Sequence, residues 1–115
     1  VLNHPAFRIP KESTWEFDEK EIIQYRRIDR YLSSLKNEID MNPGGSSRVM
    51  TLSFHRPLQA YVKSLGKSGF AITRLEEWNS HKKSQEGPRS VAEDRARAEI
   101  PLFLTLEAQK MRATR

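Results

Sequence analysis

The sequence contains no cysteine among its 115 residues. This absence excludes disulfide bonds, a thiolate zinc site and a cysteine nucleophile. No apolar run approaches the length that a membrane-spanning helix needs, so we expect no membrane contact. Taken together, these absences lead us to expect a cytoplasmic protein.

Glycine is also scarce, with five residues in all and a single adjacent pair. That pair, Gly44-Gly45, follows Asn42-Pro43 in a turn-forming stretch, and we expect no helix directly after it. A nucleotide-type cofactor in a Rossmann-like sheet needs a glycine-rich turn between a strand and a helix. We therefore expect no cofactor to bind this chain alone.

Charge of one sign is not concentrated anywhere. The net charge is +5 and the isoelectric point is near 9.7, but acidic and basic residues alternate, as in residues 93–99. This mixture predicts a solvated surface and argues against a nucleic-acid partner. With 37% hydrophobic and 30% charged residues, the chain has the composition of one small globular domain.

Residues 54–75 are the most informative stretch, because they predict a strand, a helix and a second strand in succession. Pro57 suits the first helical position, where no backbone donor is needed. Gly69 can take the left-handed conformation that ends a helix. The predicted helix, Pro57–Ser68, has one apolar stripe at helical spacing, formed by Leu58, Tyr61, Val62 and Leu65.

The segment after Pro10 is ambiguous. Asp18 and Glu21 have the spacing of a capping box, which predicts a short helix beginning near Glu19. A longer helix would align Tyr25, Ile28, Leu32, Leu35 and Ile39 on one face. Polar and aromatic residues also alternate from Tyr25 to Tyr31, so the chain could become extended near Arg26. We favour the shorter helix.

The other elements follow from alternation and turn signals. We expect an extended loop over 3–10, a hairpin pairing 38–41 with 48–55, a strand over 70–78, a loop over 79–90, a surface helix over 91–99, a last strand over 100–108 and a frayed end over 111–115. Strands 70–78 and 101–108 should pair antiparallel, with the 57–68 helix on one face.

Several short motifs follow one another along the chain: Asn3-His4-Pro5-Ala6-Phe7, Ser53-Phe54-His55-Arg56-Pro57-Leu58, Gly69-Phe70, Glu76-Glu77, and Pro101-Leu102-Phe103-Leu104 leading into Ala108-Gln109-Lys110. Their order resembles the C-terminal part of a class I S-adenosylmethionine-dependent methyltransferase of the small-molecule, type 11-like kind. In this resemblance Val1-Leu2 looks like the tail of a fifth strand, and residues 70–78 form the sixth.

The resemblance implies an α/β fold class: a truncated C-terminal portion of a Rossmann-like methyltransferase sheet, with antiparallel closing strands, helices and an inserted hairpin. Residues 1–115 would form a single partial domain, in which 8–54 are a substrate-cover insertion and 55–110 the closing helix and strands. S-adenosylmethionine and a small-molecule substrate would bind the parent enzyme, whereas the fragment should be inactive by itself.

Ligands of open α/β sheets bind beyond the carboxyl ends of the parallel strands. His4 and Trp78 follow two such ends, and the helix start places His55 at the same edge. We therefore interpret residues 8–54 and 79–99 as a substrate-side cover over this edge.

The substrate-side candidates are His4, Tyr25, Arg27, Tyr31, His55 and Trp78. His4 could orient a substrate or accept a proton, or could bond to nearby backbone. For His55 and Trp78 we favour capping and packing roles. The stretch from Tyr25 to Tyr31 could bind a carboxylate or phosphate, but an Arg27–Asp29 surface pair explains it slightly better. The catalytic residues stay unknown, and three scattered histidines do not indicate a metal site.

Two further expectations concern partners. As an alternative function, the chain could be a small basic interaction module that binds RNA or a protein, with Tyr25–Tyr31 and Lys82-Lys83 as the RNA contacts. Because the fifth strand is reduced to Val1-Leu2, the sheet should have an open edge and an exposed apolar face. We therefore predict a homodimer or swapped assembly through residues 1–7 or 48–55 and the sheet face.

Overall fold

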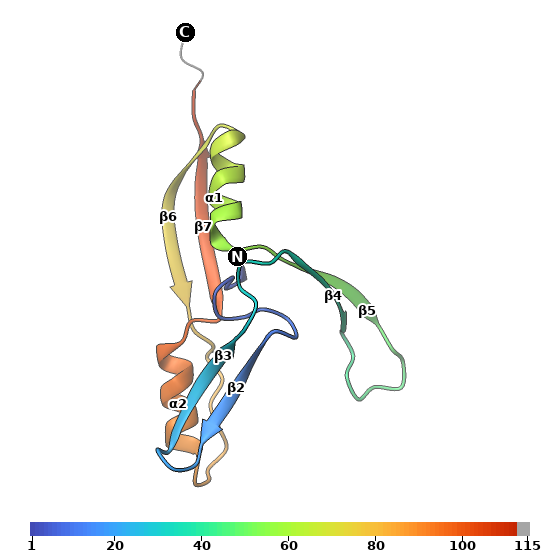
Figure 1. Ribbon diagram of the computed structural model, residues 1–115, viewed down its shortest axis with the longest axis vertical. Helices are drawn as coiled ribbons and strands as arrows, with labels where there is room; N and C mark the ends of the chain where they lie inside the picture. Colours follow the sequence, from blue (N-terminus) through green and yellow to red (C-terminus); the bar gives the residue numbers. More distant parts are fainter. Residues whose placement is uncertain (113–115) are drawn as a thin grey trace.

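The protein, described by a computed structural model over residues 1–112, is an elongated α/β chain measuring 63 × 35 × 24 Å (Figure 1). Its elements are β1 (Leu2–Asn3), β2 (Ser13–Asp18), β3 (Ile23–Ile28), β4 (Leu35–Asp40), β5 (Met50–His55), α1 (Leu58–Lys67), β6 (Phe70–Trp78), α2 (Ser90–Glu99) and β7 (Phe103–Lys110). Most of the expected frayed end lies in 113–115, outside the described residues.

The main sheet has the order β1–β7–β6, with β7 antiparallel to both neighbours. The register runs from Phe70 opposite Lys110 to Trp78 opposite Phe103, which confirms the predicted antiparallel pair. The last strand begins later than expected, because Pro101 has no backbone donor for the ladder. Since β1 and β6 both oppose β7, they run parallel to each other, and their carboxyl ends lie at one edge.

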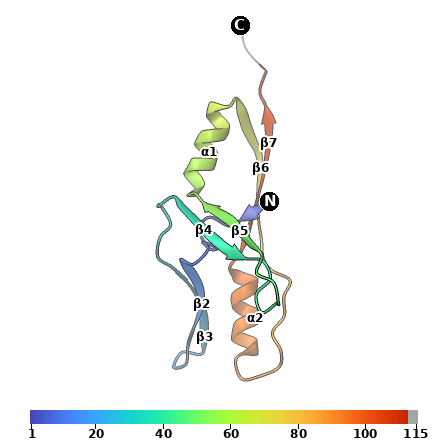
Figure 2. The same ribbon diagram turned by 90° about the vertical axis from the view of Figure 1, so that its right-hand side faces the viewer.

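Helix α1 confirms the predicted helix and packs along one side of β6 and β7 (Figure 2). Pro57 is the N-cap, one position before the predicted place, and Gly69 has a φ of 81° just past the helix end. No residue of α1 is fully buried. The apolar stripe is therefore only partly covered by the main sheet.

The short helix predicted near Glu19 is wrong, because this segment forms the β2–β3 hairpin. The Asp18 carboxylate accepts hydrogen bonds from the backbone N–H groups of Lys20 and Glu21, at 2.9 and 3.0 Å. A helix N-cap would make similar bonds, but here they close a turn. Ile22 in this turn has a φ of 55°, an uncommon left-handed conformation for a β-branched residue.

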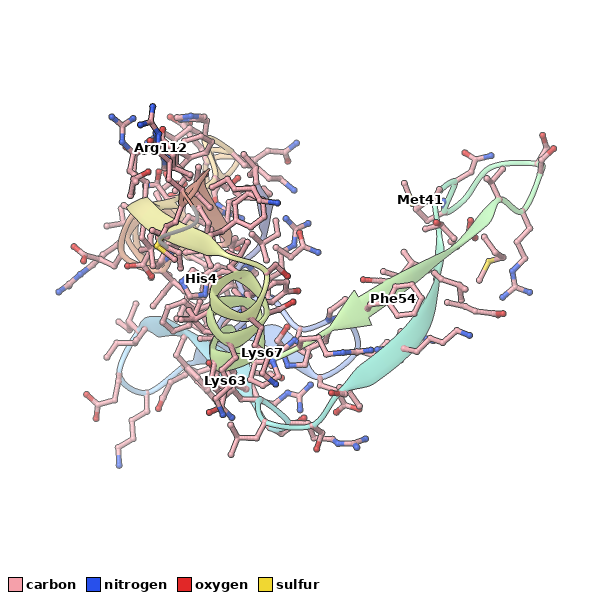
Figure 3. All side chains as sticks on the ribbon, turned by 90° about the horizontal axis from the view of Figure 1, so that it is seen from above. His4, Met41, Phe54, Lys63, Lys67 and Arg112 are labelled. Carbon is pink, nitrogen blue, oxygen red and sulfur yellow. The ribbon has the colours of Figure 1, made fainter. Side chains whose placement is uncertain are left out.

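The predicted second hairpin is confirmed, with β4 paired to β5 from Leu35 opposite His55 to Asp40 opposite Met50. It projects away from the rest of the molecule (Figure 3). Three apolar side chains along β5 are exposed, namely Met50, Leu52 and Phe54. The hairpin thus presents an apolar strand that no other described element covers.

The core is small and lies where the main sheet meets the lower half of the molecule. Its buried apolar side chains are Ile9, Ala96, Leu102 and Leu104. Helix α2, which confirms the predicted surface helix, packs against β3, and both lie beyond the carboxyl ends of β1 and β6 (Figure 1). None of the helices in the described chain is long and apolar enough to span a membrane.

Tyr31 and His55 join the loop after β3 to the start of α1. The His55 ring donates from Nε2 to the Tyr31 carbonyl oxygen over 2.7 Å, and the Tyr31 hydroxyl accepts from the Leu58 N–H at 3.0 Å. Pro57 makes no side-chain cap, so Tyr31 satisfies one of the free donors in the first turn of α1.

Tyr31→Phe should therefore lower the free energy of unfolding by about 1 kcal/mol, because the Leu58 N–H loses its partner. Chemical denaturation measures this loss, and hydrogen exchange should show faster exchange of the Leu58 amide. Tyr25→Phe is the matched control, since no hydrogen bond of the Tyr25 hydroxyl occurs within the described chain. Equal stability of the two variants would contradict the capping role.

Candidate functional site

The carboxyl ends of β1 and β6 are tied together by two side chains. His4 Nε2 lies 2.5 Å from a carboxylate oxygen of Glu77, and His4 Nδ1 accepts a hydrogen bond from the Ala6 N–H at 3.1 Å. Because Nδ1 accepts from the backbone, the proton of a neutral ring lies on Nε2 and is donated to Glu77. The structure thus brings His4 to the predicted edge.

His4 is 5% exposed, and both of its ring nitrogens are engaged. These contacts make His4 a positioning residue that fixes the end of β1, with no ring nitrogen free for a ligand. Glu77 keeps 47% of its side chain exposed, so the pair lies at the boundary between core and solvent.

Trp78 lies next along β6 and faces a hollow at this edge. The hollow is about 580 Å³ and is lined by Val1, Glu77, Trp78, Asn79, Ser80, His81 and Phe103. Trp78 is 43% exposed and opposes Phe103 in the strand register. Trp78 and Phe103 therefore lie side by side on neighbouring strands and line the same hollow.

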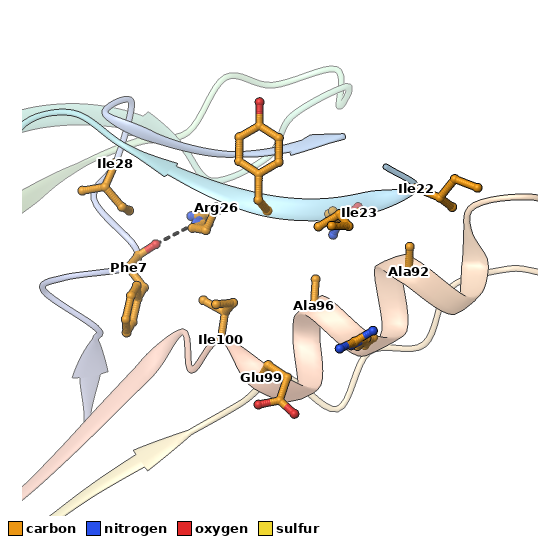
Figure 4. Close-up of a pocket in the computed structure, with 12 residues that line it drawn as sticks. Phe7, Ile22, Ile23, Arg26, Ile28, Ala92, Ala96, Glu99 and Ile100 are labelled. Atoms are coloured by element: carbon orange, nitrogen blue, oxygen red, sulfur yellow. Dashed lines mark hydrogen bonds between the residues drawn. The ribbon is translucent and has the colours of Figure 1, made fainter. Parts of the chain in front are cut away.

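A second hollow, the β3–α2 cavity, lies between the first hairpin and the last helix and measures about 440 Å³ (Figure 4). Its lining residues are Phe7, Ile22, Ile23, Gln24, Tyr25, Arg26, Ile28, Ala92, Arg95, Ala96, Glu99 and Ile100. Ala92 and Ala96 point from α2 toward β3, and their small side chains leave the space open. A volume of this size is in the range of small-molecule sites.

The cavity is connected to the His4–Glu77 pair through Phe7. The His4 and Phe7 rings lie 4.8 Å apart, and Phe7 also lines the cavity. The Phe7 carbonyl accepts a hydrogen bond from Arg26 Nε at 2.7 Å. Phe7 therefore contacts both the carboxyl edge of the sheet and the cavity.

Arg26 is half-buried and is held in place by several contacts. Its Nη2 donates to the Ser13 hydroxyl at 3.1 Å, and its guanidinium lies 5.0 Å from the centroid of the Trp15 ring. Burial, and then the positive charges of Arg8 and Arg27, hold the pKa of Arg26 below its usual value. The side chain is a half-buried cation, and no carboxylate of residues 1–112 forms an ion pair with it.

The predicted cluster from Tyr25 to Tyr31 is divided by the strand alternation. Gln24 and Arg26 lie on the same face of β3 and line the cavity. Arg27 lies on the opposite face, where it pairs with Asp29, and it does not line the cavity. Arg27 Nε also donates to Thr14 at 2.9 Å. Tyr25 is 49% exposed at the cavity rim.

The remaining candidates have structural contacts. Tyr31 and His55 form the joint at α1, so they do not meet His4 or Trp78 at the sheet edge. The stretch from Tyr25 to Tyr31 is therefore divided between strand β3 and the joint at α1. A surface pair between Arg27 and Asp29, the alternative explanation of this stretch, is present.

Sequence reasoning missed the cavity residues Gln24, Ala92, Ala96 and Ile100. One signal was available, because Ala92, Ala96 and Ile100 recur at helical spacing and mark a narrow apolar face. A second signal was the spacing of two residues along each strand. Trp15 and Phe17 on β2 lie opposite Arg26 and Gln24 on β3, so the four side chains share one face of the hairpin.

No group of three potential metal ligands occurs within residues 1–112. No protein-family model matches the sequence, and no similar protein was found among the curated proteins or the solved structures. The geometry of the carboxyl edge and of the β3–α2 cavity is therefore the basis for a functional argument.

A double-mutant cycle on His4→Ala and Glu77→Ala should give a coupling free energy of about 1 kcal/mol. This coupling free energy is smaller than that of a fully buried charge-assisted hydrogen bond, because Glu77 is half-exposed and solvent screens its charge. Denaturant unfolding of the four proteins measures it. Glu76→Ala, on the adjacent residue, is the control and should show no coupling to His4→Ala. Additive effects of the first pair would contradict the tie.

Proposed function

We propose that this chain supplies the substrate-binding side of a class I S-adenosylmethionine-dependent methyltransferase. The observation that carries the proposal is the edge where β1 and β6, which run in the same direction on either side of β7, both end, with the β3–α2 cavity beyond it. Ligands bind at this kind of edge in open α/β sheets. The β2–β3 hairpin and α2 are the cover in this proposal.

The cofactor would have to be held by residues other than these 115. The chain has no glycine-rich turn between a strand and a helix, and its one glycine pair lies in the β4–β5 turn. Strand β1 pairs only with β7 among the described strands, so its other side is open to a further strand. A cofactor-binding half could extend the sheet there.

In this function, the residues of the chain would hold and orient the methyl acceptor. S-adenosylmethionine supplies an activated methyl group, so alignment of the acceptor is the main requirement on the protein. The apolar cavity walls would exclude water, and the His4–Glu77 tie would keep the strand ends in register. No side chain of this edge is assigned to proton transfer.

The test compares the 115-residue chain with a longer protein that includes the residues encoded upstream in the same reading frame. Isothermal titration calorimetry should show binding of S-adenosylmethionine to the longer protein, and none to the 115-residue chain. A reading frame with nothing upstream, a longer protein that does not bind, or binding by the shorter chain would overturn the proposal.

We further propose that the chain associates with itself through the β4–β5 hairpin. Its radius of gyration is 17.6 Å, whereas a compact domain of this length has about 13 Å. Phe54 is 56% exposed and Leu52 is 46% exposed on the projecting β5 strand. Such a surface loses its apolar exposure when a second copy covers it.

The double variant Leu52→Ser, Phe54→Ser should shift the protein from dimer to monomer, because it removes the apolar surface of β5. Light scattering at about 100 μM, a concentration where weak dimers with Kd in the micromolar range are populated, measures the mass. Val91→Ser, at an exposed site on α2, is the control and should leave the mass unchanged. A wild-type monomer at this concentration would refute the proposal.

A further inference from the structure

We propose that the β3–α2 cavity binds a flat apolar molecule that carries one hydrogen-bond acceptor, such as an aromatic ketone, phenolate or carboxylate. The inference rests on the proposed function in naming the class of the methyl acceptor. The binding site itself depends only on residues of this chain (Figure 4).

The walls of the cavity require an apolar ligand. Phe7 and Ile28 lie at one end, Ile100 closes it from the end of α2, and Ala92 and Ala96 form the floor. The floor is made of the smallest side chains, and the opposite wall is a strand, so the space is a slot between a helix and a sheet. A flat ring system fills a slot better than a branched aliphatic chain does.

Gln24 provides the polar requirement. Gln24 lines this cavity, and its side-chain Nε2 is buried among protein atoms without a hydrogen-bond partner. In this proposal the Gln24 side chain turns toward the ligand, so that Nε2 donates to it. A buried donor without a partner costs about 1–3 kcal/mol, and this cost is removed when a ligand supplies an acceptor atom. A ligand without an acceptor would leave this free-energy cost in place. Gln24 should therefore favour a ligand that has an acceptor over one that has none.

The charges around the cavity disfavour a cationic ligand. Arg26 lies in its wall and Arg95 at its rim, with Glu99 as the acidic neighbour. The positive neighbours of Arg26 already oppose its charge, and an additional cation would increase that repulsion. A neutral or anionic oxygen is therefore the acceptor that the site favours.

The experiment uses the isolated 115-residue chain and two probes of nearly the same shape. 2-Acetylnaphthalene has a carbonyl acceptor, whereas 2-ethylnaphthalene has none. We expect the acetyl compound to bind about tenfold more tightly, because only it satisfies Gln24. Titrations followed by ¹H–¹⁵N spectra should shift the Gln24 side-chain amide resonances with the acetyl compound only.

Three variants make the test specific. Gln24→Leu should reduce the preference for the acetyl compound to less than about twofold, because the donor is gone. Ala92→Phe should weaken both probes about tenfold or more by filling the slot. Gln59→Leu, an identical change at an exposed position of α1, should alter neither affinity.

Failure to bind either probe below about 1 mM, a range that corresponds to weak contacts only, would overturn the inference. An undiminished preference in Gln24→Leu, or no effect of Ala92→Phe, would also overturn it. This test contains no S-adenosylmethionine, so its result is separate from that of the cofactor titration. If the chain binds the probe but the longer protein does not bind the cofactor, the cavity proposal stands and the methyltransferase proposal is wrong.

Discussion

The His4–Glu77 contact is the constraint on which the arrangement of the molecule depends. It joins residues 73 positions apart, at the place where the main sheet meets the lower half. The backbone supports the same point, because the His4 N–H donates to the Leu102 carbonyl at 2.9 Å. Because few apolar side chains are fully buried nearby, even a contact worth about 1 kcal/mol contributes to fixing the geometry of this junction.

The elements that could be predicted from sequence are those with strong local signals. Pro57 and Gly69 mark the ends of α1, and alternation marks β5 and β6. The β2–β3 hairpin could not be predicted in this way, because Asp18 makes the same backbone contacts in a turn as in a helix cap. The choice is made by packing of the inward hairpin face against α2, which lies far along the chain.

The location of the candidate site could be predicted from the sequence, but the roles of its individual residues could not. Topology alone indicates which strand ends share an edge, and His4 and Trp78 lie there. The roles of Tyr31 and His55 depend on backbone groups that only the folded chain brings within reach. The importance of Gln24 depends on an absence of partners, and sequence patterns carry no information on that.

The open β3–α2 cavity is unusual in a chain that buries so little apolar surface. Larger side chains at Ala92 and Ala96 would close the slot and add contacts between α2 and the hairpin, so stability alone would favour them. A ligand in the slot would supply the same contacts and would stabilise the fold in proportion to its concentration over its Kd. In the binding proposal, the small residues on α2 are accounted for by the ligand that occupies the slot.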